Sequence, residues 1–327
     1  MPSPLLDVRV AAVRALTPRI NEYLLTSCSH DPLPRYEPGA HIELHLNSPT
    51  LGQFVRHYSL IGGADEQNDP SAYLRIAVQR ESDRRGSAQI HQTLKVGSEL
   101  QISWPKNNFV LGRNDTHVLL VAGGIGITPI FSMLRSVVYR QQPFHFVYSG
   151  RTVESMAYLD SAMALAGAHG TLHLSGEPPI DHLDLVRLLA TQPADVSIYV
   201  CGPPGLINAT YVAAQTVGLA PGQVHSEQFG ALRGDDDCAF EVMFERSGKV
   251  VKVAADTSLL DAAQAAGISL LSDCRRGECG LCPLPVIGSE GPIEHRDRYL
   301  SEEEKAAGKT LCLCVSRLKG GRLVLDA

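Results

Sequence analysis

Residues 272–282, near the C-terminal end of the chain, read SDCRRGECGLC. Three of the eight cysteines of the chain stand in this stretch with the spacing Cys-x4-Cys-x2-Cys, and they are Cys274, Cys279 and Cys282. Two more, Cys312 and Cys314, follow about thirty residues later. Three closely spaced thiolates with a distant fourth form the ligand pattern of a plant-type [2Fe-2S] cluster. The stretch therefore predicts a site that carries single electrons.

Three other interpretations of these cysteines are weaker. A structural zinc site uses paired Cys-x2-Cys units, and only Cys279 and Cys282 have that spacing. Disulfides would suit a small secreted chain, which this is not. Unrelated buried thiols would rarely fall at these intervals. Gly277 and Gly280 also fit a cluster loop, because glycine permits sharp bends and a close approach of backbone N–H groups to sulfur.

The composition indicates an ordinary globular protein. Its 327 residues are 44% hydrophobic and 20% charged, with a net charge of −6 and a pI near 6.1. Two or three domains are expected at this length. No basic stripe invites nucleic acid or an anionic membrane. The sequence shows neither an apolar run of about 20 residues nor a signal peptide, so we expect a cytoplasmic protein whose cysteines stay reduced.

Residues 1–112 read as antiparallel strands. Short runs alternate between apolar and polar residues at 41–46, 73–78 and 99–104, with Gly and Pro between them. This period of two predicts a small antiparallel β-barrel. A short helix is expected around residues 88–94.

The pattern changes at residues 113–230. Residues 117–122 form a continuous apolar run, as expected of a strand buried on both faces of a parallel sheet. A glycine turn follows, after which Thr128 is expected as the N-cap of a helix and Pro129 as its first residue. Strands alternating with helices predict an α/β nucleotide-binding domain with a parallel sheet.

The last part of the chain predicts a small mixed module. Residues 231–237 are polar and contain glycine, so they are expected to be a linker. In residues 238–327 we expect a hairpin around Ser247 and Gly248, a short helix ended by Gly267, and a helix opened by a capping box at residues 301–304. With a closing strand at 323–325, this is a compact mixed α+β module of about ninety residues.

Two stretches of the barrel could hold a flavin. Arg56, Tyr58 and Ser59 share one strand and offer a cation for phosphate, an aromatic ring for the isoalloxazine and a small hydroxyl. Gly86 and Ser87 could bind a phosphate through backbone N–H and hydroxyl groups. Each motif is weak alone, because the first could be an ordinary strand and the second a charged, solvated turn.

The glycine turn of the middle domain could hold a dinucleotide. It contains Gly124 and Gly126 between a buried strand and a helix, although the third glycine of the usual fingerprint is missing. Cys201 ends another predicted strand at the same sheet edge, where ligands gather in such folds. A buried structural thiol is the alternative for Cys201.

Together these motifs resemble one family. The order Arg56-x-Tyr-Ser-Leu, Gly86-Ser87, Gly-Gly-x-Gly126-x-x-Pro, Cys201-Gly-Pro and the cysteine cluster resembles the phthalate dioxygenase reductase family, which includes the vanillate demethylase reductases. Its flavin and nucleotide modules are similar to ferredoxin-NADP reductases and precede a β-grasp ferredoxin. The resemblance covers essentially the whole chain.

The resemblance implies a reductase that takes hydride from NADH onto FMN and passes single electrons through [2Fe-2S] to a Rieske-type oxygenase. It places Arg56, Tyr58 and Ser59 at FMN, and Gly86 and Ser87 at its phosphate. It places Gly124, Gly126 and Thr128 in the NADH groove, Cys201 near the nicotinamide, and Glu227 and Phe229 beside the flavin. Ser59, Cys201 and Glu227 are thereby the candidate catalytic residues. Arg85 replaces a glycine common in relatives, which bears on the phosphate contacts.

The fourth cluster ligand is a choice between Cys312 and Cys314. Both belong to the alternating run 311–315, which predicts a strand with both thiols on one face, ~6–7 Å apart. Loop length does not decide between them. The resemblance implies Cys314, because it precedes Val315-Ser316-Arg317.

Two rival functions stay open at this point. The same electron chain could serve a haem monooxygenase or a ferric substrate. A redox sensor without turnover is the other alternative, although a sensor needs no exit for electrons. Arg151, at the end of a predicted strand, could meet a 2′-phosphate and favour NADPH over NADH.

Overall fold

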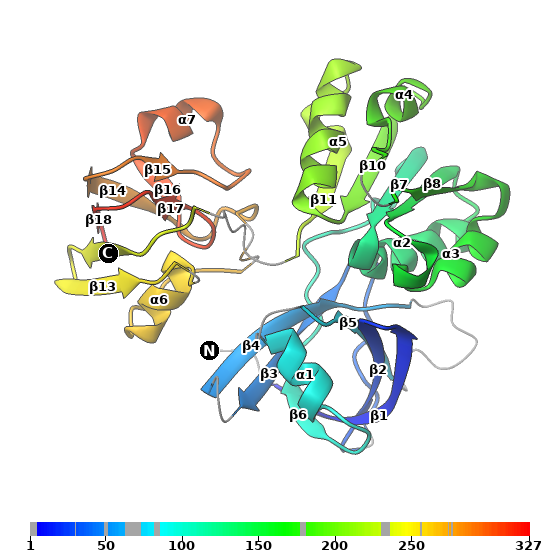
Figure 1. The fold of residues 1–327 in the computed structure, drawn as a ribbon, viewed down its shortest axis with the longest axis horizontal. Helices are drawn as coiled ribbons and strands as arrows, with labels where there is room; N and C mark the ends of the chain where they lie inside the picture. The colour runs from blue at the N-terminus through cyan, green and yellow to red at the C-terminus, as the bar shows by residue number, and fades with distance from the viewer. Residues whose placement is uncertain are drawn as a thin grey trace. The chain divides into compact units, whose positions relative to one another are not determined.

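The computed structural model describes residues 5–29, 31–48, 52–62, 73–81, 86–176, 181–229, 236–255, 257–273, 275 and 277–327. The chain divides into two units, Met1–Gln228 and Phe229–Ala327. The first contains an antiparallel and a parallel sheet, and the second a smaller mixed sheet (Figure 1). The predicted domain boundaries at 112, 230 and 237 stay predictions.

An antiparallel sheet of six strands forms the first part of the chain, as predicted. Its order is β4-β3-β6-β1-β2-β5. The elements are β1 (Leu6–Thr17), β2 (Ile20–Ser27), β3 (His41–Ser48), β4 (Gly52–Ser59), β5 (Leu74–Gln79), α1 (Gly86–Thr93) and β6 (Glu99–Ile102). Just beyond β4, Ile61 N donates to Arg75 O of β5 at 2.9 Å, so the two end strands meet. Alternate side chains such as Ile42 and Leu44 are fully buried inside.

A parallel sheet of five strands follows, in the order β11-β10-β7-β8-β9. Its strands are β7 (His117–Gly123), β8 (Phe144–Gly150), β9 (Gly170–Leu174), β10 (Val196–Cys201) and β11 (Val224–Glu227). The helices are α2 (Ile127–Tyr139), α3 (Leu159–Ala166), α4 (Leu185–Ala190) and α5 (Pro204–Thr216). Short 3-10 turns are η1 (Gly124–Gly126), η2 (Val153–Ser155), η3 (Gly167–His169) and η4 (Pro221–Gln223).

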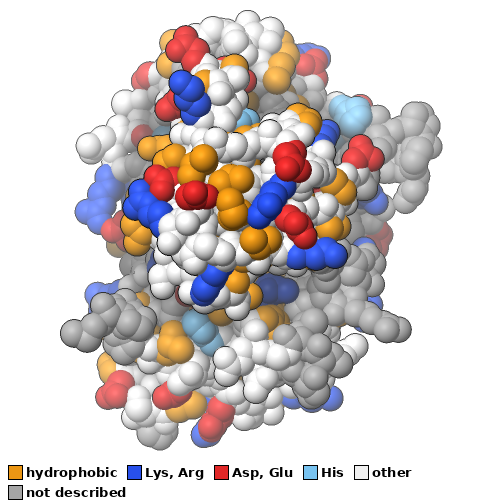
Figure 2. Space-filling model, turned by 90° about the vertical axis from the view of Figure 1, so that its left-hand side faces the viewer, with side chains coloured by type: hydrophobic (Ala, Val, Ile, Leu, Met, Phe, Trp, Pro, Cys, Tyr) orange, Lys and Arg blue, Asp and Glu red, His pale blue; other side chains and the backbone are white. Residues whose placement is uncertain are grey.

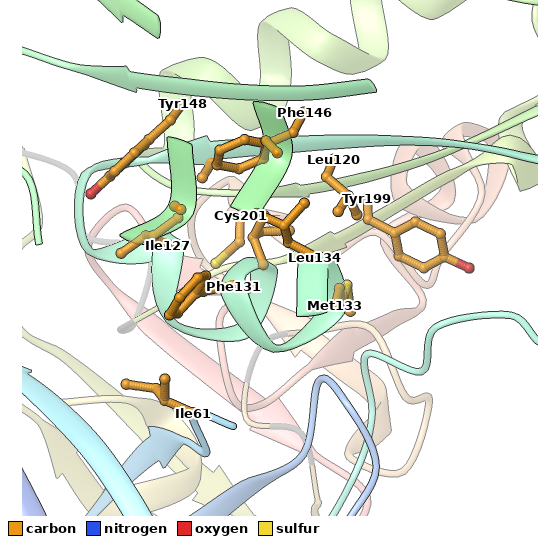
Figure 3. Packing of buried hydrophobic residues seen from close by; sticks show 14 of the residues in the cluster. Ile61, Leu120, Ile127, Phe131, Met133, Leu134, Phe146, Tyr148, Tyr199 and Cys201 are labelled. Carbon is orange, nitrogen blue, oxygen red and sulfur yellow. The ribbon is translucent and has the colours of Figure 1, made fainter. Parts of the chain in front are cut away.

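Strand β7 is buried on both faces, which explains its continuous apolar run. Leu120 belongs to a core that includes Phe131 and Leu134 of α2 (Figure 3). On the other face, Leu119 and Val121 pack in a core with residues of α4 and α5. Helices therefore cover both faces of the sheet, as expected of a parallel α/β layer.

The predicted start of α2 was wrong. The helix begins at Ile127 with Gly126 as its N-cap, so Thr128 lies inside the first turn. The Thr128 hydroxyl donates to the carbonyl oxygen of Ile125 at 3.1 Å instead of accepting from the helix. The reason is that η1 runs directly into α2, which leaves no extended residue at position 128 to act as a cap.

Helix α2 also binds the end of the barrel strand β4. The Ser132 hydroxyl donates to Leu60 O at 2.7 Å and accepts from Gly62 N at 3.1 Å. Nearby, the Tyr158 hydroxyl donates to the buried Glu22 carboxylate of β2 at 2.6 Å. These polar contacts hold the antiparallel and parallel sheets in one unit.

The second unit is built on a mixed sheet of order β13-β12-β18-β14-β16. The elements of the whole unit are β12 (Phe240–Phe244), β13 (Lys249–Val253), α6 (Leu259–Ala265), β14 (Pro283–Ser289), β15 (Ile293–Glu294), α7 (Glu302–Ala307), β16 (Thr310–Cys312), β17 (Arg317–Leu318) and β18 (Arg322–Leu325). Strand β18 pairs parallel with β12 and antiparallel with β14. The predicted capping box is confirmed, since Ser301 and Glu304 exchange both of its hydrogen bonds.

The predicted strand over residues 311–315 was wrong beyond Cys312. Strand β16 ends there, and Ser316 N donates to Cys312 O at 2.9 Å across a turn. All five side chains from Leu311 to Val315 are at most 4% exposed. The alternation of residue types therefore reflects complete burial, and a period-two pattern cannot be told from a buried turn over so short a run.

The described part of the predicted linker, Asp236 and Asp237, belongs to the second unit. The Asp237 carboxylate accepts from Arg296 Nη1 at 3.1 Å and lies 3.5 Å from Arg317 Nε. In the described ranges, no helix has the length and apolar character needed to cross a membrane.

Replacing Ser132 with Ala should destabilise the first unit. The change leaves Leu60 O and Gly62 N without their buried partner, which costs ~1–3 kcal/mol. Denaturant unfolding of the holoprotein measures the loss. Ser136→Ala, a half-buried position on the same helix, is the matched control and should change stability by less than ~0.5 kcal/mol. Equal stability of the two variants would contradict this account of α2.

Candidate functional site

The order of the parallel strands reverses along the chain at one point of the sheet. Strand β7 has β8 on one side and β10 on the other, so its C-terminal end is the topological switch point. An added Cβ on Gly126 would lie 2.2 Å from the carbonyl oxygen of Cys201. The backbone of the glycine turn thus packs directly on the end of β10.

The turn itself combines a left-handed glycine with the N-terminus of a helix. Gly124 has a φ of +54°, a left-handed conformation that suits glycine. The N-terminus of α2 follows, and helix N-termini attract phosphate through their unpaired N–H groups. Buried Thr128 stabilises this turn through its bond to Ile125. The structure therefore brings Gly124, Gly126, Thr128 and Cys201 together, as the sequence predicted.

The end of the barrel strand meets this sheet edge through a buried hydrogen bond. The Ser59 hydroxyl donates to Glu227 Oε2 at 3.2 Å. Ser59 is 4% exposed and Glu227 is 1% exposed. Glu227 ends β11 and pairs in register with Cys201 of β10. Ser59, Cys201 and Glu227 therefore lie in one region, although 168 residues separate Ser59 from Glu227.

A second cluster of candidate residues lies around Arg56 on the barrel. A Cβ on Gly86, the first residue of α1, would lie 2.6 Å from Arg56 Nε and 2.9 Å from the ring of Phe54. The Arg56 guanidinium also lies over that ring at 5.1 Å. A cation thus sits against the N-terminus of a helix, and both attract a phosphate. Arg85 lies outside the described residues.

The remaining flavin candidates differ in exposure. Tyr58 is half-buried, and burial raises the pKa of its phenol, which stays neutral. The Ser87 hydroxyl accepts from Glu81 N at 3.1 Å and keeps its own proton to donate. Phe229 is 37% exposed and follows the buried Gln228. An exposed aromatic ring can cover a flat ligand.

Sequence reasoning missed two side chains of this region. The Tyr148 hydroxyl lies 3.2 Å from Gly124 O and 3.0 Å from Ala157 O, and so holds the glycine turn. The ring of Phe54 lies against the Arg56 guanidinium. Neither residue could be singled out from the sequence, because an aromatic residue is ordinary in a strand.

In the second unit, the cluster loop is confined by close backbone packing. Gly277 has a φ of +76°, and an added Cβ would lie 2.7 Å from Val315 and 2.8 Å from Asp297. A Cβ on Gly280 would lie 2.2 Å from the ring of Tyr299. This packing requires glycine at both positions, and their predicted role beside the cluster sulfurs stays a prediction.

The cysteines converge from two segments of this unit. The Cys282 and Cys314 sulfurs are 3.2 Å apart, close to the ~3.8 Å expected for two thiolates on one tetrahedral metal. Hydrogen bonds from the thiols of Cys312 and Cys314 lower the pKa of Cys282 to about 3, which favours the thiolate that binds metal. Cys279 is half-buried in the loop, and Cys274 lies outside the described residues. Among the residues that are described, no set of three ligands has metal-site geometry. The donor chemistry of the cysteines nevertheless fits an iron–sulfur cluster.

Two domain families match the chain. Residues 242–319 match the 2Fe-2S iron-sulfur cluster binding domain, and residues 120–178 match the oxidoreductase NAD-binding domain. These ranges contain the cysteine loop and the glycine turn. They confirm the nature of the cluster and of the nucleotide domain.

Full-length relatives show the family. The chain is 39% identical over 325 residues to the heme-dependent oxidative N-demethylase beta subunit of Ectopseudomonas mendocina (strain ymp), covering 99% of both chains. It is 34% identical over 325 residues to the vanillate O-demethylase oxidoreductase of Pseudomonas sp. (strain HR199 / DSM 7063), covering 98% of this chain and 100% of the relative. The structure of phthalate dioxygenase reductase matches with 30% identity and a TM-score of 0.79, over 99% and 98% of the two chains. The chain belongs to the phthalate dioxygenase reductase family.

Membership of this reductase family confirms several predictions. The chain is an NADH-dependent oxidoreductase that transfers electrons to a [2Fe-2S] cluster. Its partner is an oxygenase, since relatives are reductase subunits of oxygenase systems. The individual roles of the site residues stay predictions.

Gly126→Ala should weaken NADH binding to this reductase. The new Cβ would lie 2.2 Å from a backbone oxygen, so the turn must move away from Cys201. We expect the KM for NADH in ferricyanide reduction to rise by about tenfold or more, a loss of ~1.4 kcal/mol or more. Gly205→Ala is the matched control, because open space surrounds its Cβ position. An unchanged KM in the Gly126 variant would place the nucleotide elsewhere.

Proposed function

We propose that this reductase supplies single electrons from NADH to a Rieske-type terminal oxygenase. The observation that carries the proposal is the buried Ser59–Glu227 hydrogen bond beside Cys201. It brings the barrel strand of the flavin candidates to the sheet edge of the nucleotide candidates. Hydride transfer needs those two ligands in contact, and this arrangement supports it.

The bound groups would supply the redox chemistry: NADH gives two electrons as hydride, FMN takes them up, and the cluster carries them singly. On the barrel, Arg56 and the N-terminus of α1 with Gly86 and Ser87 would hold the FMN phosphate. Tyr58 would lie against the isoalloxazine, and Phe229 would cover the flavin from the following segment.

The nucleotide would be held by backbone rather than by charge. Gly124 and Gly126 let the pyrophosphate approach the turn, and Thr128 keeps that turn in shape. Cys201, fully buried at the end of β10, would lie beside the nicotinamide. Arg151 is exposed and follows β8, yet the family relationship favours NADH over NADPH.

Ser59 and Glu227 would order the reacting groups. The Ser59 hydroxyl donates to Glu227 Oε2, which fixes the serine oxygen at the end of β4. Because both groups are buried, water is excluded from that point, and the serine oxygen would be held in place beside a bound flavin. No general base is required, since hydride transfer moves no separate proton.

In the second unit, Cys274, Cys279, Cys282 and Cys314 would hold the cluster. The thiols of Cys314 and Cys312 both bond to Cys282, so the choice of Cys314 follows the family resemblance. Cys312 is buried beside them and would stay a neighbouring thiol. Eight cysteines, at least four of them serving as ligands, suit the reducing cytoplasm, where we place the protein.

Long-range electrostatic attraction would contribute little to the docking of the partner. Residues 238–327 carry 13 acidic and 12 basic residues. The face shown in Figure 2 mixes both signs around hydrophobic side chains. Contacts of this kind depend little on long-range attraction.

A haem oxygenase is the second candidate partner, favoured by the name of the relative from Ectopseudomonas mendocina. Anaerobic mixing of the NADH-reduced protein with a purified Rieske oxygenase and, in parallel, with a haem oxygenase separates the two. A reduced Rieske signal in electron paramagnetic resonance is expected. A shift of a haem Soret band, with no Rieske signal, would replace the Rieske proposal by the haem one.

Cys314→Ser should remove the normal cluster spectrum and electron delivery to the oxygenase. NADH-dependent ferricyanide reduction by the flavin should survive, because the first unit is untouched. Cys312→Ser is the matched control and should keep the cluster. Visible absorption and circular dichroism measure both variants. Loss of the cluster in the Cys312 variant, with retention in the Cys314 variant, would reverse the assignment.

A further inference from the structure

Asp297 is a fully buried carboxylate in the second unit. It lies between β15 and α7, and its side chain has no exposed area. Oδ2 accepts from Leu300 N at 2.9 Å, and Oδ1 accepts from the Ser316 hydroxyl at 3.5 Å. The ring of His295, itself 8% exposed, places Nδ1 3.8 Å from Oδ1. A carboxylate is costly to bury unless it is hydrogen-bonded, so its presence here calls for a reason.

The surroundings of Asp297 connect it to both cysteine segments. A Cβ on Gly277, inside the cluster loop, would lie 2.8 Å from the Cα and Cβ of Asp297. The next residue, Arg298, donates its backbone N–H to Gly277 O at 2.9 Å. Ser316, which donates to the carboxylate, stands two residues after Cys314. Asp297 therefore touches the loop before Cys279 and the turn after Cys314.

Packing alone would not need a charged group at this point. The neighbouring side chains Val315 and Leu300 are apolar and buried. A carboxylate with two acceptor oxygens can, however, bind a backbone N–H and a hydroxyl from different segments at the same time. An apolar side chain of the same size could not fix their relative positions in this way.

We propose that Asp297 is a positioning residue for the [2Fe-2S] cluster. Its carboxylate ties the segment 297–300 to Ser316, which follows Cys314. The backbone of this segment packs on Gly277 in the loop that carries Cys279. This inference rests on the proposed cysteine ligands. Groups that orient metal ligands typically contribute 10–100-fold to metal affinity.

Cluster release from the full-length holoprotein tests the proposal. The reduced protein is mixed anaerobically with a ferrous chelator, and the half-time of cluster loss is followed by visible absorption. For Asp297→Ala we expect release about 10–100-fold faster than for the wild type, with an altered paramagnetic spectrum of the reduced cluster. Ferricyanide reduction by the flavin should be unchanged.

The conservative variant Asp297→Asn tests whether cluster retention depends on the hydrogen bonds of this side chain. In Asp297→Asn, the amide oxygen can still accept from Leu300 N, and the amide N–H can donate to the Ser316 oxygen. Release should therefore stay within about threefold of the wild type. Asp326→Ala is the matched control, because that carboxylate is paired with Arg246 at the surface of the same unit. It should leave cluster release unchanged.

Ser316→Ala provides a second test in case Asp297→Ala does not fold. It removes one of the two bonds and should speed release by a smaller factor than Asp297→Ala. Wild-type release in both Asp297→Ala and Ser316→Ala would overturn the proposal, and so would equally fast release in the Asn and Ala variants. Wild-type protein without any cluster spectrum would refute the proposed function itself, before a variant is compared.

Discussion

The proposed hydride site depends on how the end of strand β4 is held against the parallel sheet. Ser59 bonds to Glu227 of β11, and the next residues, Leu60 and Gly62, bond to Ser132 of α2. Each of these bonds is buried, so its loss is not compensated by water. The strand that carries the flavin candidates is thereby joined to the helix that follows the nucleotide turn. These polar contacts add to an apolar core that spans both sheets, in which Ile20, Ile61 and Ala77 pack with residues of α2, β7 and β8.

Close backbone approach has the same role in both units. At the nucleotide turn, Gly126 lies against the carbonyl of Cys201. At the cluster loop, Gly277 lies against Asp297 and Val315. In each place a side chain would separate two segments that must meet around a ligand. Glycine permits this proximity, and in the second unit the buried Asp297 also bonds to Ser316 beside the contact.

The limits of pattern reasoning appear at particular residues. Thr128 has the composition of an N-cap, yet the preceding turn is already helical and the helix starts at Ile127. The run 311–315 alternates like a strand, yet all five residues are buried in a strand end and a turn. Local propensity was overruled by tertiary packing in both cases. By contrast, the run 117–122 was correctly predicted as a buried parallel strand, because burial on both faces leaves no alternation.

The sequence by itself determined the chemistry of the chain. Cysteine spacing indicated the cluster, apolar periodicity indicated the antiparallel and parallel sheets, and the ordered motifs indicated the reductase family. These signals are local, since ligand type and burial pattern are properties of short segments. Only the tertiary structure decided which distant groups meet. The Ser59–Glu227 bond, the contact of Gly86 with Arg56, and the approach of Asp297 to Gly277 each join residues from separate segments. Such contacts arise from the packing of whole elements, and no short stretch of sequence encodes them.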